Sequence, residues 1–144
     1  MFQRFTDNNK VVSALVPLTG NSDRASSAID TLGYDQVFIV FAVGAAGDTW
    51  SSTNKIEMEI QDGATTTTAA AADASLTTVA TGATNTGTAK IVSAAGDASK
   101  IYTTQYTGKK RYIKAVVNFS GTHANGSPTS VTVILGNPVA APAA

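Results

Sequence analysis

The sequence predicts an all-β fold, a single-domain antiparallel β-sandwich or jelly-roll-like barrel of seven to eight strands with long Ala/Thr/Gly-rich loops. Two observations carry this prediction. Segments of five to eight residues rich in β-branched and aromatic side chains recur along the chain, and Gly, Pro, Asn or Asp separates them. No amphipathic pattern of helical period extends over ten or more residues, which argues against alternating α/β architecture.

The first part of the chain predicts an arm and two strands. Residues 1–10 are polar and read as an N-terminal arm, and residues 11–16 form a strand that Pro17 and Gly20 end. Residues 21–30 are a polar connection. Residues 36–43 (QVFIVFAV) are apolar at both odd and even positions, which predicts a central strand covered on both faces.

The strand over residues 55–61 shows a period of two. Ile56, Met58 and Ile60 alternate with polar residues, so we expect them to point into the core. The opposite face would be charged and solvated, and Asp62-Gly63 would close the strand with a turn. The outward residues of this predicted strand are Lys55, Glu57, Glu59 and Gln61.

The middle of the chain is poor in large apolar residues. Residues 64–74 read as a polar loop or a short surface helix, residues 81–88 as a loop, and residues 75–80, 89–94 and 100–106 as short strands. The expected loops thus contain much of the Ala and Thr in the chain.

The last third predicts two strong strands, residues 111–119 and 130–135, whose alternate residues face the core. We expect residues 100–106 and 111–119 to form a hairpin with Thr107-Gly108 at its tip. The sandwich domain would span residues 11–138, and residues 139–144 would form a flexible Pro/Ala tail.

Composition excludes several kinds of chemistry. The chain has no Cys, one His, and ten basic against ten acidic residues. Thiolate metal sites and disulfides are therefore excluded, little material exists for acid–base catalysis, and no net charge attracts nucleic acid or an anionic membrane. We expect no cofactor, no metal and no enzymatic activity. No signal-type or membrane-spanning apolar run is present, so we expect assembly in a cytoplasm.

Contact residues are expected in three places. Phe2, Arg4 and Phe5 either tuck into the core or anchor the arm on a neighbour. A basic cluster guards a strand edge or contacts an acidic partner. Glu57 and Glu59 share one strand face and form a solvated surface or an inter-subunit salt bridge. The cluster comprises Lys109, Lys110, Arg111 and Lys114.

Two other residues have weaker functional interpretations. His123 lies in a turn-rich loop without a nearby acid, so we expect a solvated or hydrogen-bonded loop histidine. Trp50, with Asp48 and Asn54 nearby, is the local candidate for stacking on a sugar ring.

Both ends of the chain resemble small head proteins of tailed phages and gene transfer agents. The similar segments are residues 10–17 (KVVSALVP), 28–34 (AIDTLGY), 106–117 (YTGKKRYIKAVV), 119–123 (FSGTH), 131–138 (VTVILGNP) and 140–142 (AAP). The resemblance implies a non-enzymatic capsid decoration (cement) or head-accessory protein. It also implies binding to the major capsid protein at capsomer junctions, commonly as a trimer, on the surface of the virion. The alternative from another class is a receptor- or carbohydrate-binding β-sandwich displayed on the virion as a spike or fibre head.

Overall fold

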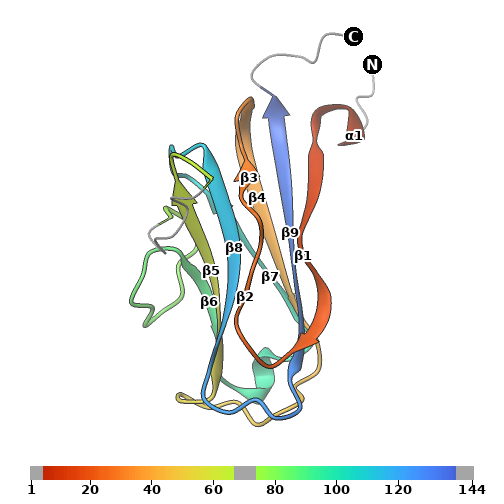
Figure 1. The fold of residues 1–144 in the computed structure, drawn as a ribbon, viewed down its shortest axis with the longest axis vertical. Coiled ribbons are helices and arrows are strands. Elements are labelled where there is room, and N and C mark those ends of the chain that lie inside the picture. The colour runs from red at the N-terminus through yellow and green to blue at the C-terminus, as the bar shows by residue number, and fades with distance from the viewer. Residues whose placement is uncertain (1–4, 67–73, 139–144) are drawn as a thin grey trace.

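Two antiparallel β-sheets pack face to face in the computed structural model, which describes residues 5–66 and 74–138 (Figure 1). Sheet A has the strand order β1-β9-β4-β7, and sheet B has the order β2-β8-β5-β6, with β3 also paired to β8. The elements are α1 (Phe5–Asn8), β1 (Lys10–Gly20), β2 (Arg24–Ala25), β3 (Ile29–Asp30), β4 (Tyr34–Val43), β5 (Lys55–Gly63), β6 (Thr88–Val92), the 3₁₀ turn η1 (Ala95–Asp97), β7 (Lys100–Tyr106), β8 (Tyr112–Ser120) and β9 (Ser127–Pro138).

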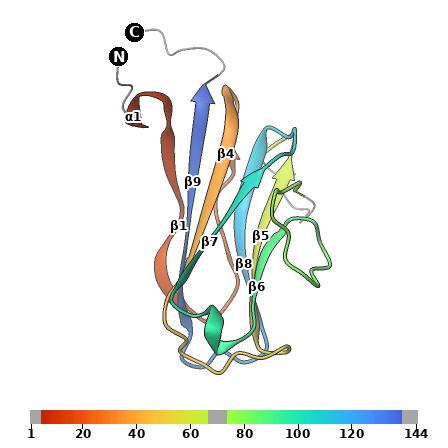
Figure 2. The same cartoon turned by 180° about the vertical axis from the view of Figure 1, so that it is seen from behind.

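The strand order is that of an eight-stranded jelly roll. The short strands β2 and β3 both pair with β8, so together they act as one interrupted strand. Counted in this way, each sheet has four strands, and the first and last strands of the chain, β1 and β9, are neighbours in sheet A. The sheets are open and do not close into a barrel. Figure 2 shows the same sandwich from behind, with β7 and β6 at neighbouring edges of the two sheets. The prediction of an all-β sandwich is thus confirmed.

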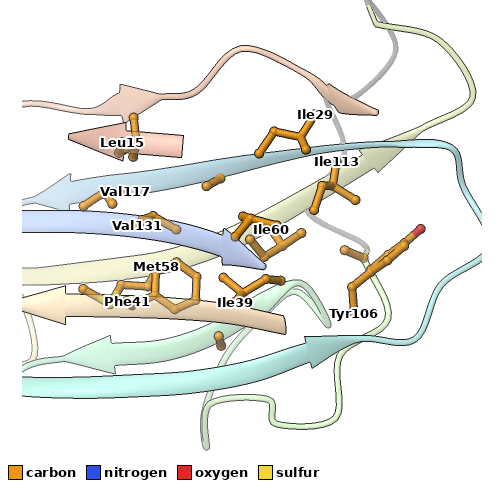
Figure 3. Close-up of a cluster of buried hydrophobic side chains, with 14 of the residues drawn as sticks. Leu15, Ile29, Ile39, Phe41, Met58, Ile60, Tyr106, Ile113, Val117 and Val131 are labelled. Carbon is orange, nitrogen blue, oxygen red and sulfur yellow. The ribbon is translucent and has the colours of Figure 1, made fainter. Parts of the chain in front are cut away.

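The core lies between the sheets and is built from alternate residues of the long strands. Figure 3 shows Phe41, Ile39 and Val131 from sheet A directed toward Met58 and Ile60 from sheet B. All five side chains are completely buried. The inward positions predicted from the period of two are confirmed for three strands, and the buried residues there are Ile56, Met58, Ile60, Ile113, Ala115, Val117, Val131, Val133 and Leu135.

The first strand is longer than predicted, because Pro17 does not end it. β1 continues to Gly20, with register shifts between Ser13 and Leu15 and between Leu15 and Leu18. Proline is compatible with this position because β1 is an edge strand, where a missing N–H does not break a central ladder.

β4 is central in sheet A, as predicted, but only one of its faces is covered. Val37, Ile39, Phe41 and Val43 are buried, whereas Phe38, Val40 and Ala42 are half-buried. No described segment covers the outward face of β4.

The predicted hairpin between β7 and β8 is wrong. β7 pairs with β4 in sheet A, and β8 pairs with β5 in sheet B, so residues 107–111 cross from one sheet to the other. The phenol of Tyr106 holds this crossing: it donates to Asp62 Oδ2 at 2.7 Å and accepts from the Lys110 backbone N–H at 2.9 Å. The predicted turn at Asp62-Gly63 is also wrong, because both residues belong to β5.

Other sequence predictions differ in detail. Residues 75–80 form no strand, but Leu76 makes an isolated bridge to Tyr106. Within the predicted arm, residues 5–8 form the single helical turn α1, and Lys10 already belongs to β1. Phe2, Arg4 and the tail at residues 139–144 lie outside the described residues.

Candidate interaction surface

Among the described strand residues, none of those on the outer face of sheet A is charged. The residues of this face are identified by register, because residues directly opposite each other in antiparallel strands point to the same face. Phe38, Val40 and Ala42 of β4 alternate with the buried residues of that strand, and their cross-strand partners share their side. This surface, called the sheet A outer face below, comprises Val11, Ser13, Phe38, Val40, Ala42, Ile101, Thr103, Gln105, Ser130, Thr132 and Ile134.

Apolar side chains form a continuous band across this face. Val11 pairs with Ile134, which pairs with Phe38, so three strands contribute to one apolar row. At the other end Ala42 pairs with Ile101, which is 68% exposed. Val16 and Leu18 in the irregular second half of β1 are also largely exposed, but Leu18 pairs with the buried Thr129 and lies outside this face. A band of this kind is typical of a surface that another molecule covers.

The two lysines of these strands lie outside the sheet A outer face. Lys10 pairs with the buried Leu135 and Lys100 with the buried Val43, so both belong to the inward-facing positions at strand ends. The register therefore keeps positive charge away from the outer face.

Charge is concentrated instead on the opposite side of the molecule. The outward positions of β5 and β8 in sheet B include Glu57, Glu59 and Lys114. Glu57 forms an ion pair with Lys55, with 2.8 Å between Oε1 and Nζ, and its side chain is about one quarter exposed. The two outer faces of the sandwich thus differ in chemistry, one uncharged and one charged.

Glu59 corrects the prediction of a solvated acidic strand face. Its side chain is buried, with the residue only 5% exposed, and it accepts a hydrogen bond from Asn118 Nδ2 at 2.5 Å. Residues 85–88 lie beside it: Thr88 pairs with Glu59, the Asn85 side chain is hydrogen-bonded to its carboxylate, and Ile60 N–H donates to Gly87 O at 2.8 Å. Burial raises the pKa of Glu59 above its usual value, and the hydrogen bond from Asn118 opposes this rise.

We expect Glu59→Gln to stabilise the protein at neutral pH. A group whose pKa is higher in the folded than in the unfolded chain contributes stability below its unfolded value of 4.5, and this contribution is lost as the pH rises through the folded value. Glutamine keeps an acceptor for Asn118 without the buried charge. Thermal unfolding measured from pH 4.5 to 8 should show the Gln variant gaining over the wild type as the pH rises.

Glu57→Gln is the matched control for this experiment. It lies two residues away on the same strand face but pairs with Lys55 at a position that is about one quarter exposed, where an ion pair contributes about 0–1 kcal/mol. It removes only the charge repulsion between Glu57 and Glu59, which is a smaller cause of the raised pKa than burial, so it should leave most of the pH dependence of the wild type in place. Equal pH profiles for Glu59→Gln and the wild type would show that the burial of Glu59 has no energetic consequence.

The basic cluster does not form one patch. Arg111 donates to both carboxylate oxygens of Asp30, at 3.0 and 2.7 Å, and this contact lowers the pKa of Asp30 to about 2. Lys109 and Lys110 are exposed in the crossing between the sheets, whereas Lys114 is half-buried on β8. The charge of Arg111 is thus paired within the chain, and two exposed lysines lie at the end of the sandwich.

Trp50 does not provide the exposed ring that a sugar site needs. It is 6% exposed and belongs to the hydrophobic core. Asp48 instead accepts hydrogen bonds from the backbone N–H groups of Asn125 and Gly126, and Asn54 donates to Thr49 O. The residues of the predicted glycan contact therefore pack and connect the loops at one end of the sandwich.

Two further residues named from the sequence are His123 and Phe5. His123 is hydrogen-bonded as expected, with Nε2 2.9 Å from Ser120 O, but it is buried against the ring of Phe119 and not solvated. Phe5 is 60% exposed on α1. Sequence reasoning missed Val11, Ile101 and Ile134 as surface residues; the signal that could have found this face is the apolar outer side of β4.

The sequence matches no protein-family model, and a search of curated proteins returned no match. Among residues 5–66 and 74–138, no group of three or more His, Asp or Glu side chains is arranged to hold a metal ion. The same residues contain no helix that is long and apolar enough to cross a bilayer.

Proposed function

We propose that this chain is a non-enzymatic viral structural protein, a capsid decoration (cement) protein that binds capsomer junctions and stabilises a phage head. The observation that carries the proposal is the uncharged, partly apolar outer face of sheet A. The centres of protein interfaces are depleted of charged residues, so this face has the composition of a docking surface.

The position of this face supports a docking role. The face includes the outward side of β4. This strand has apolar residues on both sides, which is typical of a strand that is covered on both faces. In the proposal the shell of the major capsid protein supplies the second cover. Apolar burial contributes about 25 cal/mol per Å², so even a modest face gives useful affinity when several copies bind together.

The fold and the resemblance at both chain ends are compatible with this function. Jelly rolls occur in viral capsid domains and in lectins, so the fold alone does not distinguish the two classes. The burial of Trp50 removes the feature that had suggested a carbohydrate site. The proposed place of the protein is the outer surface of the virion, with self-association, as a trimer in the resembled family, adding avidity.

The proposal is tested with phage heads that lack their decoration protein. Purified protein is added, unbound protein is removed, and the heads are heated while DNA release is measured. We expect bound protein to raise the temperature at which the heads break, because links between capsomers resist internal pressure. Heads that bind no protein, or that break at the same temperature with it bound, would contradict the proposal.

A further inference from the structure

Most sheet edges of the sandwich are protected against pairing with another chain. Residues 75–77 cover the end of β7, where Thr77 N–H donates to Gln105 O and Thr107 N–H donates to Ser75 O. β2 and β3 have only two residues each. β6 has five residues, is interrupted by a register shift, and receives Ala80 N–H at Thr88 O. Short, irregular or covered edges of this kind prevent strand addition.

Two half-strands stay open among the described residues: residues 100–103 of β7, where Ile101 is 68% exposed, and the first half of β1, which also borders a groove. β1 has eleven residues, and none of the described strands pairs with it on the side away from β9 (Figure 1). Its second half is protected by Pro17 and by two register shifts, whereas Lys10 to Ser13 pair with β9 without interruption. Val11 in this regular half is 58% exposed. A regular, open edge that exposes an apolar side chain is a template for another strand.

Space for a second strand exists beside this edge. An open groove of about 330 Å³ separates β1 from the β2–β3 segment. Small side chains line much of it on both sides: Ser13, Ala14, Ser26, Ser27 and Ala28. Side chains of an added strand that point toward the sandwich interior would enter this groove.

We infer that the first half of β1 pairs antiparallel with the same half of β1 in a second copy of the chain, around a two-fold axis at Val11 or Val12. Antiparallel self-pairing brings each residue opposite one that points to the same face. With the axis at Val12, Val11 lies opposite Ser13 of the second copy and Lys10 opposite its Ala14. With the axis at Val11, Lys10 lies opposite Val12 of the second copy. Neither arrangement places two lysines opposite each other.

The charge of the chain also favours a second copy as the occupant. The formal net charge is zero, so two copies approach without overall repulsion. The pairing would join two copies of sheet A into one eight-stranded sheet and make their uncharged outer faces continuous. This contact goes beyond the proposed function and does not depend on it. It is two-fold, so it produces dimers, or joins trimers in pairs.

The chain contains no cysteine, which allows a direct test by single-cysteine crosslinking. Val11→Cys, Val12→Cys and Ser13→Cys are oxidised mildly in solution without phage heads. A residue on the axis faces its own copy at about 4.5–5.5 Å between Cβ atoms. A residue one position from the axis lies diagonally across from its copy, two residues further along the strand. The distance between their Cα atoms then exceeds the roughly 7 Å that a disulfide spans.

We expect a disulfide-linked dimer in the Val11 or the Val12 variant only. Leu18→Cys is the matched control, because Leu18 is 54% exposed on the same strand but in its irregular half, and it should stay unlinked. Sedimentation of the wild type should show even multiples of the chain mass. The inference is overturned if neither variant crosslinks, if Leu18→Cys crosslinks equally fast, or if the wild type is a monomer or an isolated trimer. Head binding is measured separately, so a failure of either proposal leaves the other testable.

Discussion

Replacing Val40 by lysine is expected to weaken binding to undecorated heads by roughly 30- to 1000-fold, equivalent to about 2–4 kcal/mol. Val40 lies at the centre of the sheet A outer face, between Thr132 on β9 and Thr103 on β7. A lysine there would bury an unpaired charge on docking, which costs several kcal/mol unless a partner is present. The measurement is a binding isotherm of purified protein on heads, with the folded state checked by thermal unfolding.

Ile91→Lys is the matched control for this substitution. Ile91 is also a half-buried β-branched residue, but it lies opposite Glu57 on the outer side of sheet B. It should bind heads as the wild type does. Wild-type affinity for Val40→Lys, or an equal loss for Ile91→Lys, would show that sheet A is not the docking face.

Replacing Phe41 by alanine is expected to lower the free energy of unfolding by about 3–5 kcal/mol. Phe41 is completely buried on the central strand β4 and packs against the core residues of both sheets (Figure 3). Removing its ring leaves a cavity that the close-packed strands cannot fill. Denaturant unfolding measures the loss, which should appear as a lower midpoint at an unchanged slope.

Val40→Ala separates this effect from a general sensitivity of β4. Val40 is the preceding residue of the strand and points to the opposite, partly exposed face. Its truncation should cost less than half as much as that of Phe41. A loss below about 1 kcal/mol for Phe41→Ala, far under the usual cost of truncating a core aromatic residue, would contradict the described core.

The sequence predicted the inward positions of β5, β8 and β9 because a period of two specifies one buried face of a strand. It did not predict which strands pair. The connection of residues 107–111 is short enough for a hairpin, and no local signal shows that it crosses between the sheets. That crossing depends on the contact of Tyr106 with Asp62, which is distant in the sequence.

The candidate surface was only partly predictable. The apolar pattern on both sides of β4 indicated a cover, and the described chain leaves one side uncovered. The burial of Glu59 could not be predicted, because residues 85–88, which lie beside it, are distant in the sequence. Trp50 lies in a segment of loop composition, and its contribution to the core depends on how the end loops pack.

A three-dimensional reconstruction of phage heads decorated with the wild-type protein would show which face of the sandwich contacts the shell. We expect each copy to lie with the sheet A outer face against the capsid shell and with Glu57 and Lys114 of sheet B directed to solvent. Copies bound through sheet B or through the end loops, with Phe38 and Val40 exposed to solvent, would contradict this expectation.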